Sequence, residues 1–168
     1  MNRGLFVALL VGVAAAAMAL PALKMPYAAG TAAVRPQHHR NASRLQLIKI
    51  DLDYKPKVRP EFGQLRGYDP VVATVHMGDR VQFINEDDAE HTASGFALTG
   101  QRIPAHYHFA GDPTVRKGRI IDASEWSTGN LRAHGGKSQV FIAKNPGNYF
   151  YACSYHLGQN MRGVIVVH

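Results

Sequence analysis

Turn residues divide this chain into short β-type runs, and no three-turn stretch with an amphipathic helical pattern lies between them. Apolar and polar side chains alternate over residues 45–53 and again over 80–84. The turn signals between the runs include Met77-Gly78-Asp79 and Asn145-Pro146-Gly147. About seven short strands punctuated in this way predict an all-β fold, an antiparallel sandwich or barrel. The other predicted strands, rich in β-branched or aromatic residues, are 70–75, 138–143, 148–153 and 163–167.

Residues 1–30 differ from the rest of the chain. Arg3 precedes an uncharged apolar run over residues 5–23, and small residues follow, as in a secretory signal peptide. The alternative is an uncleaved membrane anchor, because the run is close to the roughly 20 residues that span a bilayer. In either case we expect a periplasmic or otherwise extracytoplasmic protein. Residues 31–43 are polar without periodicity and predict a flexible linker, which leaves residues 44–168 as one domain.

The net charge of +7 does not indicate a nucleic-acid partner. Residues 1–30 hold two of the 19 basic residues and none of the 12 acidic ones, so the remainder carries +5. No long Lys/Arg run interleaves with aromatic residues, as a nucleic-acid footprint requires. A positive balance favours an acidic partner or an anionic membrane surface. We interpret an acidic cluster before His91 as a solvated turn, but it could also dock a basic partner, so the charge of the partner stays open. The cluster comprises Glu86, Asp87, Asp88 and Glu90.

The only cysteine in the chain is Cys153. Exported domains use cysteines in disulfide pairs, so a lone thiol there needs burial or an occupant. Between two predicted strands, Cys153, His156 and Met161 lie on one short loop with the spacing C-x2-H-x4-M. A thiolate, two imidazoles and a weak axial thioether form a blue-copper site. The second imidazole has to come from elsewhere, and His91, just past the strand over 80–84, is the best candidate.

Four motifs in this order resemble the cupredoxin (type 1 blue-copper) family, especially its plastocyanin and pseudoazurin branch, over residues 44–168. The resemblance implies an eight-stranded Greek-key β-sandwich that binds one copper near one end. It further implies electron transfer between a donor and an acceptor, such as a cytochrome or a copper enzyme. We expect a monomer, and because the four ligands leave no coordination position for a substrate, we expect no enzyme. The motifs are Met77-Gly78-Asp79 before Val81-Gln82-Phe83-Ile84-Asn85, the pair His91-Thr92, the run Asn145–Tyr151, and Cys153-x2-His156-x4-Met161-x-Gly163.

The sequence departs from the family pattern in three places. Residues 97–120 form an insertion with no clean period, and we expect an excursion between strands with a helical turn. Ala152 stands where plant plastocyanins place a tyrosine. Thr92 stands where the family often has asparagine, and we expect its hydroxyl to tie the two ligand loops together through Ser154.

Some interpretations stay open. The alternative to an electron carrier is a copper-binding carrier or resistance protein, or else a zinc site or no metal. Of the five methionines, three lie within residues 1–25, so no Met-rich carrier motif exists. The insertion contains His106 and His108, which we interpret as a solvated pair. The alternative is that they bind a second metal or contact a partner. We assign Trp126 to the core and the remaining candidates to the surface: His76, His134 and His168.

Overall fold

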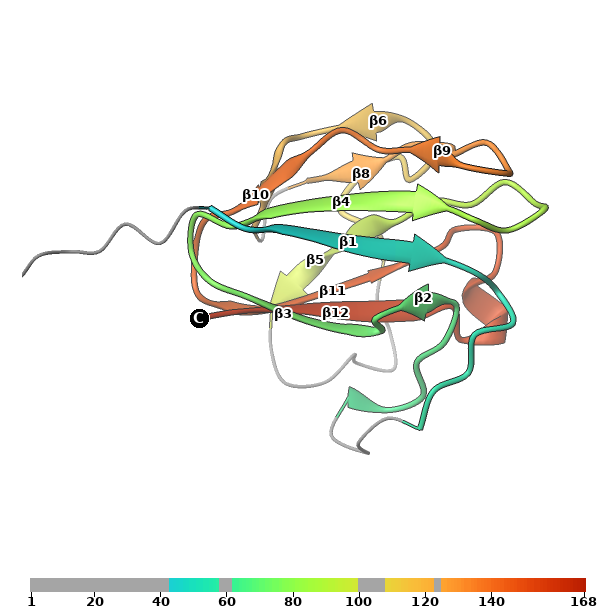
Figure 1. The fold of residues 1–168 in the computed structure, drawn as a ribbon, viewed down its shortest axis with the longest axis horizontal. Coiled ribbons are helices and arrows are strands. Elements are labelled where there is room, and N and C mark those ends of the chain that lie inside the picture. Colours follow the sequence, from blue (N-terminus) through green and yellow to red (C-terminus); the bar gives the residue numbers. More distant parts are fainter. Residues whose placement is uncertain (1–42, 58–61, 100–107, 123–124) are drawn as a thin grey trace, which may run out of the picture. The chain divides into compact units, whose positions relative to one another are not determined.

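The computed structural model describes residues 43–57, 62–99, 108–122 and 125–168, and these form two six-stranded β-sheets (Figure 1). One sheet has the strand order β2-β1-β4-β10-β7, with β9 beside β4, and the other has the order β3-β12-β11-β5-β8-β6. In chain order the strands are β1 (Leu45–Ile50), β2 (Tyr68–Asp69), β3 (Val72–Val75), β4 (Arg80–Asn85), β5 (Ser94–Thr99), β6 (Arg116–Lys117), β7 (Ile120–Ile121), β8 (Ser127–Thr128), β9 (Gly136–Lys137), β10 (Phe141–Ala143), β11 (Gly147–Ala152) and β12 (Arg162–Val167).

The chain crosses repeatedly between the sheets, as in a Greek-key sandwich. It passes from β3 to β4, from β4 to β5 and from β10 to β11, each time into the other sheet, while β11 and β12 are antiparallel neighbours. The pairs β1–β4 and β3–β12 are parallel. The all-β sandwich predicted from the sequence is therefore confirmed.

The predicted helical turn in the insertion is not found in its described part, residues 97–99 and 108–120. That part instead contributes the end of β5, all of β6 and the start of β7. Residues 1–42 and 100–107, which hold the predicted signal or anchor, most of the linker and His106, lie outside the described residues. Within the described residues, no helix has the length and apolarity needed to cross a bilayer.

A cluster of aromatic rings fills the space between the sheets. The inward side chains of β4 alternate with outward ones, which places Phe83 at the centre of the cluster with no exposed surface. Its ring centroid lies 5.2 Å from that of Tyr151 and 6.2 Å from that of Trp126. Tyr68 and Phe141 complete the cluster from β2 and β10. Trp126 is 2% exposed, in agreement with its predicted place in the core.

Asp79 organises the turn between β3 and β4. Its two carboxylate oxygens accept hydrogen bonds from the backbone N–H groups of Arg44 and His76, each at 2.9 Å. Burial of the carboxylate opposes ionisation, but these N–H donors outweigh it and lower the pKa of Asp79 below the ordinary value. The turn thus binds the beginning of β1 to the β3–β4 connection.

We expect the contribution of Asp79 to stability to depend on pH. A carboxyl whose pKa is lowered by folding stabilises the protein fully above its unfolded pKa of about 3.9, and this stabilisation is lost as the pH falls through the lower folded value. Asp79→Asn should therefore cost about 1.5–3 kcal/mol at pH 7, and the deficit should shrink in acid. Urea unfolding of the metal-free domain measures both, with exposed Asp53 as the matched Asp→Asn control. A deficit independent of pH would contradict the role of the charge.

The strands bring the predicted ligands to one end of the sandwich. β1 and β4 both point toward the end where the short 3-10 helix η2 (Leu157–Gln159) lies, and the C-terminus lies at the opposite end (Figure 1). His91 follows β4 and is bridged to Leu131, so the end of one sheet is connected to the loop that precedes β9.

Candidate metal centre

Three of the predicted ligands meet at this end of the sandwich. The ligand atoms of His91, Cys153 and His156 all lie within 4.8 Å of one another. The Cys153 Sγ atom is 3.5 Å from His91 Nδ1 and 3.6 Å from His156 Nδ1. His91 and Cys153 have no exposed surface, whereas His156 is partly exposed. A thiol and two imidazole nitrogens thus converge at the boundary between core and surface.

Backbone hydrogen bonds fold the loop between β11 and β12. The N–H of Cys153 donates to the carbonyl of Met161 at 3.1 Å, and the N–H of Met161 donates to the carbonyl of His156 at 3.3 Å. Asn160 adopts the left-handed conformation at φ 61°, which asparagine tolerates better than most residues, and its N–H closes η2 on Leu157. The loop is therefore closed by its own main chain, with the three candidate ligands at fixed positions along it.

Met161 is fully buried and its side chain packs against Gly67. A Cβ atom at residue 67 would lie 2.6 Å from Met161 Cγ and 3.3 Å from Sδ. Gly67 also has φ +80°, a conformation that glycine adopts without strain. Gly67 is therefore needed for the Met161 side chain to occupy its place. Sequence reasoning missed this residue, and the only available signal was a lone glycine just before a predicted strand.

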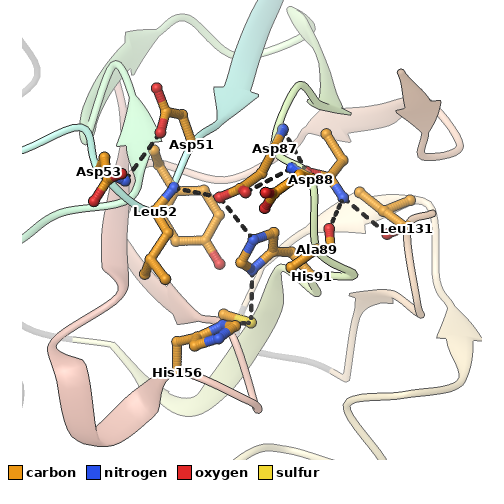
Figure 2. Close-up of polar contacts among 12 residues, drawn as sticks. Asp51, Leu52, Asp53, Asp87, Asp88, Ala89, His91, Leu131 and His156 are labelled. Carbon is orange, nitrogen blue, oxygen red and sulfur yellow. Dashed lines mark hydrogen bonds and ion pairs between the residues drawn. The ribbon is translucent and has the colours of Figure 1, made fainter. Parts of the chain in front are cut away.

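The carboxylate of Asp87 contacts the His91 ring on the side away from Cys153. Its Nε2 atom lies 3.0 Å from Asp87 Oδ2, and Figure 2 shows the ring between Asp87 and the sulfur atom that also faces His156. Burial lowers the pKa of His91, and the neighbouring Asp87 opposes this only in part, so the imidazole is neutral near neutral pH. Neutral imidazole is the form that binds a metal ion.

The acidic cluster before His91 is not simply the solvated turn that the sequence suggested. The Asp87 side chain is only 15% exposed and faces inward, because the end of β1 and the His91 ring both offer it hydrogen-bond donors. Glu86 pairs with Lys49 at 3.1 Å, while Asp88 and Glu90 are exposed. Sequence reasoning missed Asp87 as part of the site, and its signal was an acidic residue four positions before a candidate ligand.

The model of one protein family, copper binding proteins of the plastocyanin/azurin family, matches residues 57–168. The chain belongs to this family. This cupredoxin is similar in structure to a purple cupredoxin from Nitrosopumilus maritimus, at 18% identity and a TM-score of 0.43, over 73% of this chain and 98% of that one. No curated protein matches the sequence.

Two further solved structures are similar to this chain. A pseudoazurin from Sinorhizobium matches at 19% identity and a TM-score of 0.41, over 74% of each chain. A variant of amicyanin with Cu(I) matches at 15% identity and a TM-score of 0.44, over 74% of this chain and 82% of that one.

Copper is the cofactor of this cupredoxin, and its residues fit the ion. A buried thiol and two imidazoles stand together, with the methionine that carries the thioether on the same loop. Thiolate and thioether suit Cu(I), and imidazole suits Cu(II), so this donor set accepts both oxidation states. The cluster of ligand atoms contains no carboxylate oxygen within the described residues, as expected for a site of this softness.

The predicted contact between the two ligand loops is confirmed. The N–H of Ser154 donates to Thr92 Oγ1 at 3.0 Å, and the two hydroxyl oxygens lie 3.3 Å apart. The N–H of Thr92 donates to Cys153 Sγ at 3.5 Å. Tyr68 extends the network, since its hydroxyl donates to the Thr92 carbonyl at 2.6 Å. The metal end is thus a hydrogen-bonded unit that does not depend on the ion for its connections.

Four other histidines lie within the described residues, and none of them belongs to the group of converging ligand atoms. His76, His108, His134 and His168 are exposed.

Proposed function

We propose that this cupredoxin carries single electrons between redox proteins, with one copper ion held by His91, Cys153, His156 and Met161. The observation that carries the proposal is the convergence of a buried thiol and two imidazoles at 3.5–3.6 Å on a hydrogen-bonded frame. When bound, copper supplies a Cu(II)/Cu(I) couple that accepts and releases one electron. The chain holds its donor groups in place, which limits rearrangement when the oxidation state changes.

The residues around His156 favour an electron route through this side chain. His91, Cys153 and Met161 are fully buried, so His156 is the proposed ligand that reaches the surface. Beside it, Tyr155 is 49% exposed and its hydroxyl donates to Asn130 Oδ1 at 2.8 Å. We infer that a partner protein docks over this part of the loop. Four protein ligands leave no position for a substrate, which supports an electron carrier over an enzyme.

The place of action belongs to the same proposal. We propose that the protein works in the periplasm or elsewhere outside the cytoplasm, as a monomer, delivered or anchored by the apolar run over residues 5–23. Its donor and acceptor would be redox proteins such as a cytochrome or a copper enzyme. The lack of a concentrated basic run in the sequence argues against a nucleic-acid partner.

The proposal is tested by loading the purified domain with Cu(II) and recording its visible spectrum and its voltammogram. We expect intense visible absorption and a reversible one-electron wave. A second functional reading, copper delivery, would appear as a colourless protein that binds only Cu(I). That result would refute the electron carrier.

Met161→Gln is expected to keep the copper but to lower the reduction potential. An amide oxygen is a harder ligand than a thioether and therefore favours Cu(II), and the axial ligand tunes the potential of such sites. Voltammetry of the variant measures the shift. Met77→Gln, at a methionine that is 57% exposed, serves as the matched control. An unchanged potential in the Met161 variant would show that Met161 is not the axial ligand.

A further inference from the structure

Asp87 lies on the side of the His91 ring that faces away from Cys153. Its Oδ2 atom is 3.0 Å from His91 Nε2, and Nδ1 of the same ring is 3.5 Å from Cys153 Sγ (Figure 2). The His91 side chain has no exposed surface and the Asp87 side chain only 15%. Solvent ions therefore screen this contact much less than they screen a surface pair.

Backbone donors hold the Asp87 carboxylate in position. Its Oδ2 accepts the N–H of Leu52 at 2.7 Å, and its Oδ1 accepts the N–H of Asp88 at 2.6 Å. The N–H of Asp87 in turn donates to Asn85 Oδ1 at 3.1 Å. Leu52 follows β1 and Asp87 follows β4, and these strands pair in parallel with Ile50 opposite Asn85. The carboxylate thus joins two neighbouring strand ends and is fixed by the fold, independently of a metal.

The Asn85 side chain fixes the loop on its other side. Its Nδ2 atom donates to the carbonyls of Ala89 at 2.7 Å, Leu131 at 3.0 Å and Arg132 at 3.1 Å. These hydrogen bonds fix the segment between Asn85 and His91, and Figure 2 draws those to Ala89 and Leu131 as dashed lines. A carboxylate on so constrained a segment has little freedom to turn away from the ring.

We propose that Asp87 is a positioning residue for the copper site. Its carboxylate accepts a hydrogen bond from the Nε2–H group of His91, so that the lone pair of Nδ1 faces Cys153, and it places a fixed negative charge behind that ligand. The inference rests on the proposed function, because it takes His91 as a copper ligand. A carboxylate behind a ligating histidine orients the ring and raises its basicity, and a nearby negative charge favours Cu(II) over Cu(I). Both effects lower the reduction potential.

The test compares Asp87→Asn with Asp88→Asn in the copper-loaded protein. Asp88 is the adjacent residue and is exposed, so its variant removes the same charge without touching the His91 ring. Asp87→Asn should weaken Cu(II) binding about 10-fold and Cu(I) binding less. If only Cu(II) binding changes, a 10-fold change raises the potential by about 59 mV for one electron. Asp88→Asn should give a much smaller shift, and Asp87→Glu should return the potential toward the wild-type value.

Equal shifts in Asp87→Asn and Asp88→Asn, or no shift in either, would overturn the positioning role. Nitrogen-15 NMR of the copper-free wild type provides a second measurement that needs no variant. We expect His91 to carry its proton on Nε2, and a proton on Nδ1 would overturn the proposal even if Asp87→Asn does not fold. Failure of the proposed function would appear differently, as a wild-type protein with no reversible one-electron wave whatever its tautomer.

Discussion

Cys153→Ser is expected to abolish the intense visible absorption of the copper-loaded protein. The thiolate is the form of cysteine that binds metals, and a serine hydroxyl does not ionise comparably near neutral pH. The substituted side chain is nearly the same size and lies in the same fully buried position, so the fold should survive. The N–H of Thr92, now 3.5 Å from Sγ, would then face a neutral oxygen. Absorption spectroscopy after Cu(II) addition measures the loss, and circular dichroism reports on the fold.

Ser154→Ala is the matched control for that experiment. It changes the adjacent residue and removes the hydroxyl that lies 3.3 Å from Thr92 Oγ1, but it leaves the Ser154 N–H bond to Thr92 and all four proposed ligands. We expect the absorption to remain, at most shifted. If the Cys153→Ser protein kept its full colour, the sulfur would not be a ligand and the assignment of the centre would be wrong.

Phe83→Ala should remove much of the stability of the domain. The side chain is fully buried between the sheets, and truncation of a buried phenylalanine typically costs about 3–5 kcal/mol through lost transfer energy and an unfilled cavity. Domains of this kind have only about 5–15 kcal/mol in total. Four aromatic rings surround the site, so the cavity has rigid walls and collapses poorly; they belong to Tyr68, Trp126, Phe141 and Tyr151.

Urea unfolding of the copper-free domain, followed by the fluorescence of Trp126, measures this loss. Trp126 is the only tryptophan and stacks on Phe83, so its signal reports directly on the cluster. Ile142→Ala on β10 is the control, because this apolar side chain is 46% exposed and should cost within about 0.5 kcal/mol. A similar cost for the two variants would mean that Phe83 is not central to the packing.

Three of the four candidate ligands could be picked out together because they are close in the chain. Cys153, His156 and Met161 share one hairpin loop, whose ends are fixed by the pairing of β11 with β12. His91 was harder to predict, since 62 residues separate it from Cys153 and only the motif after β4 pointed to it. Asp87 and Gly67 were missed because their sequence signals are weak, and the contacts with Leu52 and Met161 that complete their roles join residues distant in sequence.

The strands show the same division. Those with alternating or β-branched runs were predicted near their observed bounds, whereas β5 and the two-residue strands carry too little pattern of their own. β10 is shorter than the predicted 138–143, for a reason that only the fold reveals. The N–H of Ser138 donates to the Phe83 carbonyl, and its hydroxyl accepts a hydrogen bond from the Phe83 N–H. The side-chain amide of Gln139 donates to the carbonyls of Lys117 and Ser127. These bonds replace the regular pairing expected there.

The two ends of the described chain meet at the turn between β3 and β4. The hydroxyl of Ser43 donates to the Gly78 carbonyl at 2.9 Å, and the N–H of Met77 donates to the carbonyl of His168 at 2.9 Å. This turn and the C-terminus lie at the end of the sandwich away from η2 (Figure 1). A tag, linker or electrode tether joined beside Ser43 or at His168 would therefore lie at the opposite end of the sandwich from the loop that carries Tyr155 and His156, and would leave that loop accessible to a redox partner.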